Sequence, residues 1–274
     1  PMHDTAYEIG RLFFETYGRS NQVILEYGSY NVNGSLRDFC PEGAAYLGLD
    51  IGKGPSVDIF LDEGKPIPLR DEFADIVVSS SVLKHDRFFW DSFLEMARLL
   101  KPGGILYINV PSNGYFHRYP VDCWRFYPDS GKALEALART RGYPFTLVEC
   151  FIAERKSDVW NDFVAIYAKA DEADVTAPKF LSDLVPCRNV IRLGAEGVDR
   201  FHPQSEDMSL IVKLRQQSAA LAAALSEETS RAQKAEEALQ AGHLAEIAAK
   251  DAIIAQLKQR LDATSRTEEN VEDS

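Results

Sequence analysis

The sequence has no long apolar run, few cysteines and no excess of basic charge. Nowhere do about 20 consecutive residues stay apolar, so we expect no membrane-spanning helix. The N-terminal stretch is too charged for the apolar core of a secretory signal. The chain has 30 lysines and arginines against 42 aspartates and glutamates, a formal net charge of -12. Proteins that bind nucleic acid usually present a basic face, so we expect no nucleic-acid partner.

Cysteine usage and two missing glycine motifs exclude further classes of site. The four cysteines are scattered, without a C-x-x-C pair, so the sequence predicts neither a zinc site nor a disulfide framework. We therefore expect no metal, reduced thiols and a cytoplasmic location. The dinucleotide motif G-x-G-x-x-G and the triphosphate motif G-x-x-x-x-G-K-[ST] are also missing, so neither ligand is expected.

Short apolar strands alternate with helical stretches over residues 1–170, which we interpret as one globular domain. This alternation predicts an α/β fold with a doubly wound, mostly parallel sheet of seven strands and helices on both faces. The segment "ERKSDVW" between the last two strands is too short for a crossover helix, so one of them must run antiparallel. The expected strands are Gln22–Tyr27, Ala44–Leu49, Val57–Phe60, Ala74–Ser79, Gly104–Val110, Phe145–Ala153 and Asp162–Lys169.

The composition changes beyond the predicted sheet. Residues 171–204 contain prolines and turns with weak periodicity, and we interpret them as a linker or a packed arm. Residues 205–264 have no proline, and their apolar positions approximate a heptad repeat. This pattern predicts a C-terminal coiled-coil helix paired with a partner helix, hence a homo-oligomer, without choosing dimer or trimer. A single frayed helix, or one docked on the globular part, is the alternative. Residues 265–274 are polar, and we expect them to be disordered.

The ends of the first two strands indicate a ligand site. In an open parallel sheet, ligands bind beyond the carboxyl ends of the strands. The first strand ends at Glu26, followed by Gly28 and Ser29, and the second is followed by Asp50. The small residues would let a nucleoside lie against the turn, and a carboxylate at the second position commonly accepts hydrogen bonds from ribose hydroxyls. Because the phosphate-binding motifs are missing, the sequence favours a nucleoside ligand without phosphates. A nucleoside whose other end is an amino acid, that is, S-adenosylmethionine, fits this description.

Five successive segments resemble the motifs of class I S-adenosylmethionine-dependent methyltransferases. The similarity is to the type 11-like branch associated with bacterial surface-glycan biosynthesis, and it covers about residues 9–169. It implies a Rossmann-like sheet and methyl transfer to an acceptor. The segments are "VILEYGSYNVNGSLRDF", "YLGLDIGKGPSVDIFLD", "FADIVVSSSVLKHD", "FLEMARLLKPGGILYINVPSNG" and "FHRYPVDCWRFYPD".

The resemblance also implies a set of cofactor-binding residues. Asp50 would bind the ribose, Ile51 would pack on the adenine, and Asp62 would accept a hydrogen bond from the adenine amino group. Ser79 or Ser80 would lie near the methionine part. The full expected set is Glu26, Gly28, Ser29, Asp50, Ile51, Asp62, Ser79 and Ser80.

Two histidines are candidates for the base that accepts the proton of an acceptor hydroxyl. With a usual pKa near ~6.5, a histidine suits this task. His117 is the favoured base, with Asp122 as its orienting partner, and His85 is the alternative. The branch usually reads Glu-His where this chain has Lys84-His85, a departure that could alter the substrate side or impair the site.

The substrate-side candidates lie in the same segment. Arg125 could pair with Asp122 or hold an anionic substrate, and Tyr115 and Trp124 could stack on a sugar ring or simply fix their loop. The leading interpretation is a methyltransferase that acts on a sugar or glycan hydroxyl. The rival is a degenerate methyltransferase domain that serves as a cofactor-binding or coiled-coil scaffold.

Overall fold

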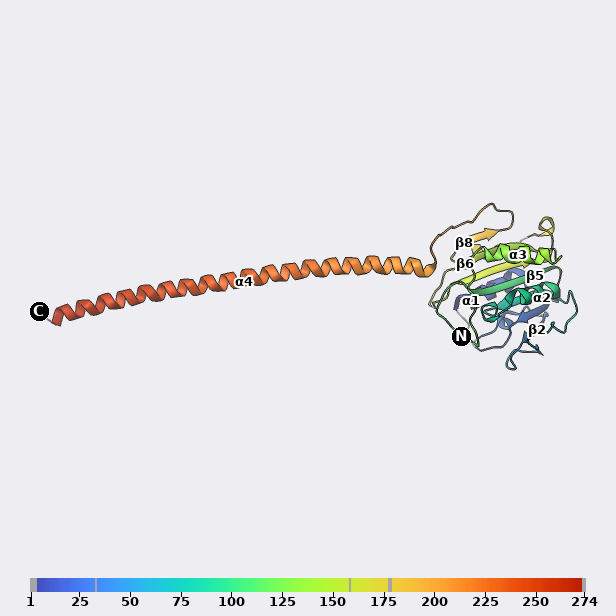
Figure 1. Ribbon diagram of the computed structural model, residues 1–274, viewed down its shortest axis with the longest axis horizontal. Coiled ribbons are helices and arrows are strands. Elements are labelled where there is room, and N and C mark those ends of the chain that lie inside the picture. Colours follow the sequence, from blue (N-terminus) through green and yellow to red (C-terminus); the bar gives the residue numbers. More distant parts are fainter. Residues whose placement is uncertain (1–3, 33, 158, 177–178, 273–274) are drawn as a thin grey trace. The chain divides into compact units, whose positions relative to one another are not determined.

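A computed structural model describes residues 4–32, 34–157, 159–176 and 179–272. These residues include a mixed sheet of eight strands in the order β3-β2-β1-β4-β5-β7-β6-β8 (Figure 1). Strands β1 to β5 pair in parallel, and the strand order reverses between β1 and β4, which makes that place the switch point of the sheet. The strands are β1 (Val23–Tyr27), β2 (Ala45–Asp50), β3 (Ile59–Phe60), β4 (Ala74–Ser80), β5 (Leu100–Pro111), β6 (Thr146–Ala153), β7 (Asp162–Ala168) and β8 (Cys187–Arg192).

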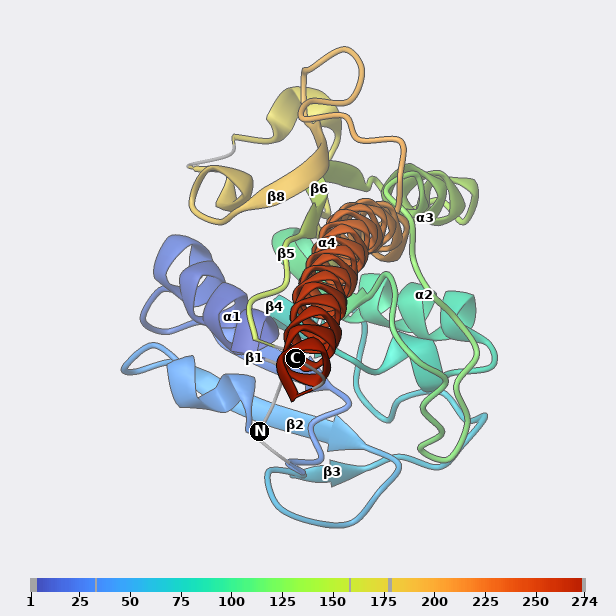
Figure 2. The same cartoon turned by 90° about the vertical axis from the view of Figure 1, so that its left-hand side faces the viewer.

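Helices cover both faces of the sheet. They are α1 (Asp4–Tyr17), α2 (Phe89–Leu99) and α3 (Ser130–Thr140). Figure 2 shows α1 on one side of the sheet and α2 and α3 on the other. Ile9 and Phe13, one helical turn apart on α1, pack in one core cluster, whereas Phe93 of α2 and Leu134 of α3 pack in the other. The prediction of a doubly wound, Rossmann-like α/β fold is confirmed.

The strand predictions were correct for seven of the eight strands described. β7 pairs antiparallel with both β5 and β6, so the predicted reversal is confirmed. The predicted number of strands is wrong, because β8 adds an antiparallel strand beside β6 at the edge of the sheet. In its sequence, "CRNVIR", the first, fourth and fifth residues are buried, and apolar and polar side chains do not alternate. The usual strand signal is therefore missing from this segment.

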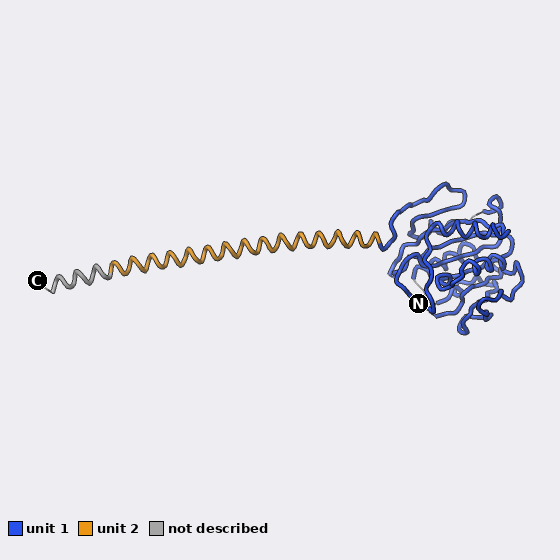
Figure 3. Tube along the Cα trace, viewed as in Figure 1, with its two compact units in different colours: residues 1–207 blue, residues 208–274 orange. Residues whose placement is uncertain are grey.

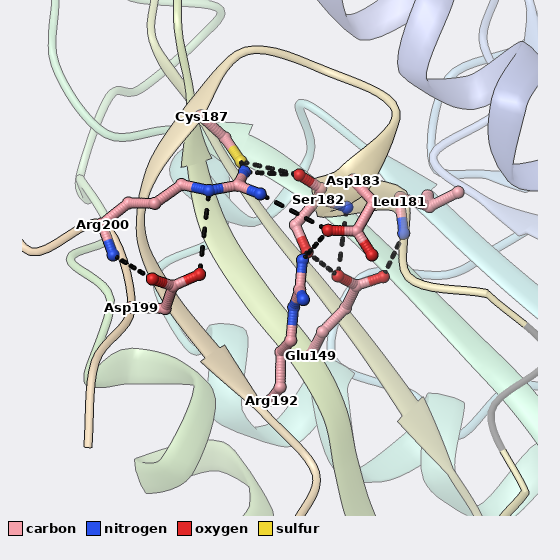
Figure 4. A network of polar contacts seen from close by, with 8 residues as sticks. All are labelled: Glu149, Leu181, Ser182, Asp183, Cys187, Arg192, Asp199 and Arg200. Atoms are coloured by element: carbon pink, nitrogen blue, oxygen red, sulfur yellow. Dashed lines mark hydrogen bonds and ion pairs between the residues drawn. The ribbon is translucent and has the colours of Figure 1, made fainter. Parts of the chain in front are cut away.

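A buried polar network fixes β8 and the segment before it onto the sheet (Figure 4). The carboxylate of Glu149 on β6 is fully buried and accepts hydrogen bonds from the backbone of Leu181 at 2.6 Å and from the hydroxyl of Ser182 at 2.6 Å. Arg192 donates to the same hydroxyl at 2.6 Å, and Arg200 donates to the Ser182 carbonyl at 2.5 Å. Burial raises the pKa of Glu149. This part of the chain therefore packs within the first compact unit, residues 1–207.

The second unit, residues 208–274, is almost entirely helical (Figure 3). The helix α4 (Glu206–Glu272) runs through most of the segment that was expected to be disordered. All side chains from Ile211 to Arg260 are exposed. A C-terminal helix is thus present, and its pairing in a coiled coil stays a prediction. None of the helices described is long and apolar enough to cross a membrane.

Candidate active site

The turn after β1 is shaped by the protein's own packing. Gly28 has φ +84°, and its N–H donates to the Leu49 carbonyl at 2.8 Å. A Cβ atom at this position would lie 1.9 Å from a methyl carbon of Val82. Glycine is needed here for both its positive φ and this close contact. The packing of Val82 thus accounts for glycine at this position, and the expectation that a nucleoside lies against the turn stays a prediction.

Asp50 lies beside this turn, at the carboxyl end of β2. One carboxylate oxygen accepts a hydrogen bond from the Tyr30 backbone N–H at 2.9 Å, and the other accepts from the Gly52 N–H at 2.7 Å. These bonds fix the carboxylate, and each oxygen retains a lone pair for a further donor. Ile51 follows with 55% of its surface exposed, so an apolar surface is available next to the fixed carboxylate.

Several polar atoms at the carboxyl ends of β1, β4 and β5 are buried without a hydrogen-bond partner among the residues described. They are the hydroxyls of Ser29, Ser79, Ser80 and Ser81 and the side-chain oxygen of Asn109. An unsatisfied buried polar atom costs about 1–3 kcal/mol. A bound polar ligand or water at this edge would remove that cost. The donor set therefore suits the polar groups of a nucleoside and of an amino acid.

Two of the expected cofactor residues, Glu26 and Asp62, are less available to a ligand than Asp50. Glu26 is 3% exposed, and burial raises its pKa to about 7. Its carboxyl group is thus poised between the neutral and charged forms near neutral pH. Asp62 lies in the exposed segment after β3 and accepts a hydrogen bond from Lys65 at 2.9 Å. A contact between Asp62 and an adenine would have to compete with this surface ion pair.

Arg125 organises the loop that follows β5. A guanidinium group has five donor hydrogens, and Arg125 makes five hydrogen bonds. It makes two bonds to the Asp122 carboxylate at 2.6 and 2.8 Å, and the others reach three backbone carbonyls. The side chain of Asp122 is 2% exposed, and the Arg125 guanidinium lowers its pKa to about 2. Of the two roles left open for Arg125, the structure shows the pair with Asp122.

The two histidines lie together beside this loop, with ring centroids 5.8 Å apart. Asp122 accepts from the backbone N–H of His117 at 2.6 Å, so it positions the main chain there. The His117 Nδ1 atom is buried and has no hydrogen-bond partner within the described chain. His85 Nδ1 contacts the Val121 carbonyl, and burial lowers the His85 pKa. The structure thus gives the His85 ring an orienting contact, whereas Asp122, the expected orienting partner of His117, contacts the His117 main chain.

The aromatic candidates differ in exposure. Trp124 donates from its indole nitrogen to the Asp86 carbonyl at 2.8 Å and packs edge-to-face on Phe89. Trp124 therefore ties the loop to α2. Tyr115 is 60% exposed, and its ring centroid lies 4.9 Å from that of Trp160. Of the two candidates Trp124 and Tyr115, only Tyr115 presents a large surface to an incoming molecule.

Trp160 was not predicted as a site residue. It packs against the loop between β5 and α3, residues 112–129, which we call the acceptor-side loop. It is 4% exposed and lies between β6 and β7. The Lys84 Nζ atom lies 4.9 Å from its ring centroid, and the His117 ring meets it edge-on at 6.3 Å. Gly114 has φ +101°, and a Cβ atom there would lie 2.1 Å from the indole. Its segment, "ERKSDVW", has no periodicity that would predict a buried residue.

The chain matches a family model described as a methyltransferase domain over residues 19–108. This range contains β1 to β4 and most of β5, with Asp50 and the buried serine hydroxyls. Over these residues the chain carries a methyltransferase domain, and the methyl donor of such a domain is S-adenosylmethionine. No curated protein matches it.

Solved structures similar to the chain include two methyltransferases. The 1,6-didemethyltoxoflavin-N1-methyltransferase of Burkholderia thailandensis, solved with S-adenosylhomocysteine, is 17% identical. That match covers 62% of this chain and 80% of the other at a TM-score of 0.49. A SAM-dependent methyltransferase of Aquifex aeolicus is 13% identical, with 60% and 91% covered and a TM-score of 0.43. At these values, neither neighbour informs the substrate of this chain.

Proposed function

We propose that this methyltransferase transfers a methyl group to a hydroxyl of a sugar or glycan, in the cytoplasm. The observation that carries the proposal is an exposed aromatic loop beside the two histidines, at the edge of the sheet where the buried polar atoms of the cofactor side lie. Tyr115, Phe116 and Tyr119 are 60%, 74% and 55% exposed. Aromatic rings with an apolar face and a polar edge suit sugar rings. The four free cysteines fit the reducing cytoplasm.

For the cofactor, we assign the ribose to Asp50 and the methionine end to the serine hydroxyls at the end of β4. Bound S-adenosylmethionine supplies an activated sulfonium methyl and leaves as S-adenosylhomocysteine. The chain then has to orient the acceptor and remove one proton from its hydroxyl. The fixed carboxylate of Asp50 and the buried hydroxyls of Ser79 and Ser80 support this assignment.

The geometry favours His85 as the base over His117. The contact of His85 Nδ1 with the Val121 carbonyl makes that nitrogen the donor, which leaves Nε2 as the proton acceptor. The lowered pKa keeps the imidazole neutral at pH 7. His117, 5.8 Å away between ring centroids, would then position the acceptor or share the proton.

Transfer of a tritiated methyl group from S-adenosylmethionine to an array of bacterial surface polysaccharides tests this function. The wild type should label at least one glycan. His85→Ala should reduce transfer by about 100-fold or more, whereas His117→Ala should retain more activity. The reverse pattern would reassign the base to His117. If cofactor binding persists but no glycan is labelled, the sugar acceptor is wrong.

We further propose that α4 pairs with α4 of a second copy. Its exposed apolar side chains include Leu221 at 72% and Leu225 at 66%, four residues apart. Isolated helices of polar composition are marginal in water, so a partner would stabilise this one. Light scattering of the full chain should give an oligomer, and Leu221→Asp with Leu225→Asp should give a monomer. The control Ala223→Asp, on the opposite face of the helix, should leave the mass unchanged.

A further inference from the structure

We propose a second binding site, built by β8 and the segment after it against the ends of β5 and β6, which takes sugar units of the acceptor next to the reacting one. This inference rests on the proposed glycan acceptor. β6 runs in the same direction as β5, so Ile152 and Ser112 lie at one edge of the sheet, the edge of the cofactor strands. β8 is antiparallel to β6 and therefore begins at that edge.

Two adjoining hollows mark the site. The first is a recess of about 70 Å³, and the second is an open groove of about 410 Å³. The groove falls within the ~300–1,000 Å³ range of small-molecule sites. The recess has room for a single substituent, so a ring in the groove would extend a hydroxyl or hydroxymethyl group into it. Both hollows are lined by Tyr127, Pro128, Asn189, His202 and Pro203.

The positive charge of Arg188 in the recess is already paired. Arg188 forms ion pairs with Glu154 at 3.3 Å and with Glu206 at 2.6 Å. Its Nε–H is buried and has no hydrogen-bond partner among the residues described. An anionic ligand would have to displace a carboxylate from the guanidinium, whereas a neutral hydroxyl oxygen could accept from Nε without breaking an ion pair. The recess therefore suits an uncharged polyol rather than an acid.

His202 supplies a complementary acceptor. Asn189 holds its backbone with two hydrogen bonds, accepting from the His202 N–H at 2.7 Å and donating to its carbonyl at 3.1 Å. The His202 Nδ1 atom lies 3.0 Å from the Gln204 carbonyl and 3.5 Å from Nη1 of Arg188. The shorter contact favours Nδ1 as the donor, which leaves Nε2 as the acceptor. A buried donor and a fixed acceptor in one recess can bind neighbouring hydroxyls of a sugar.

Two exposed aromatic side chains line the groove. Tyr127 is 63% exposed and Phe201 is 70% exposed, and each contributes to the groove wall. An aromatic face beside planar polar groups is a favourable surface for a pyranose ring. These side chains are on the surface, so replacing them should not disturb the core.

The recess is joined to the acceptor-side loop through one residue pair. Asn113 accepts from the Asn161 backbone at 2.6 Å and donates to its side chain at 2.8 Å. The Asn113 carbonyl also accepts from Arg125 at 3.0 Å. Asn113 and Asn161 line the recess and lie next in sequence to Gly114 and Trp160, which pack on each other. A glycan could thus reach from Tyr115 into the groove.

The test uses the full-length protein and oligosaccharides of one to six units, cut from a polysaccharide that the wild type labels on the array. Tyr127→Ala and Phe201→Ala should each raise KM about 2- to 10-fold for acceptors of three or more units. The KM for a single unit and the affinity for S-adenosylhomocysteine should stay within twofold of the wild-type values. Leu184→Ala, at an exposed apolar residue shortly before β8 and outside the groove lining, should change nothing.

The outcomes separate this inference from the proposed function. If the wild type labels no glycan, the proposed function fails and this site loses its ligand. If the wild type labels a glycan but both groove variants keep its KM at every length, the second site is wrong and the function stands. An equal loss for short and long acceptors would also overturn it, because a separate site affects only longer chains.

Discussion

The cofactor edge of the sheet and the acceptor-side loop satisfy their polar groups in opposite ways. At the cofactor edge, the hydroxyls of Ser79 and Ser80 are buried without a hydrogen-bond partner in the described part of the chain. In the loop, the hydrogen bonds of Arg125 use all five of its donor hydrogens, and two of them pair it with Asp122. The first region is thus built for a ligand to complete, whereas the second is already rigid and can hold exposed side chains in position.

The largest expected effect is on the rigid loop. Arg125→Met leaves the Asp122 carboxylate buried and unpaired, which should cost about 3–5 kcal/mol in the free energy of unfolding. Denaturant unfolding measures it. Arg118→Met, an exposed arginine of the same loop, should stay within about 0.5 kcal/mol of the wild type. Equal losses for the two variants would show that the loop does not depend on the Arg125–Asp122 pair.

A somewhat smaller effect is expected at the cofactor edge. Asp50→Ala removes a charged acceptor of two ribose hydroxyls, each bond to a charged group being worth about 1.5–3 kcal/mol. The affinity for S-adenosylhomocysteine should therefore fall about 100-fold or more by calorimetry. Glu63→Ala, at an exposed carboxylate, serves as the control. An unchanged affinity in Asp50→Ala would remove the ribose assignment.

Acid should reduce the stability that the Arg125–Asp122 pair contributes to the fold. Arg125 lowers the Asp122 pKa from 3.8 to about 2, so the charged form stabilises the fold above pH 3.8. That contribution, about 2 kcal/mol, is lost as the pH falls from 3.8 towards 2. The difference in unfolding free energy between the wild type and Asp122→Asn should shrink over this range. A constant difference would contradict the pairing.

The smallest effect is expected for Ser79→Ala, which should stabilise the free protein and weaken ligand binding. Ser79 is fully buried, and its hydroxyl has no partner in the described chain. Ser79→Ala removes that unsatisfied group, so the free protein should become more stable by up to about 1 kcal/mol. The affinity for S-adenosylhomocysteine should fall a few-fold. Thermal unfolding with and without the ligand checks both signs, and a loss of stability in the free protein would contradict them.

The sequence predicted the regions where local pattern and structure agree. Asp50 at the end of β2 followed from the strand pattern, since the ends of parallel strands meet at one edge. The serines at the end of β4 were named through the family resemblance. The reason for Gly28 was missed, because only the folded chain shows Val82 against it. Trp160 and β8 were missed because neither segment has a periodic pattern and their partners lie far away in sequence. Long-range packing, rather than local preference, decides those residues.

The most direct test of the account is a crystal structure of the protein with S-adenosylhomocysteine. We predict that both ribose hydroxyls lie within hydrogen-bond distance of the Asp50 carboxylate. At least one hydroxyl among Ser79, Ser80 and Ser81 should contact the amino acid end of the ligand. A ligand bound elsewhere, with Asp50 holding only Tyr30 and Gly52 as it does here, would contradict the account.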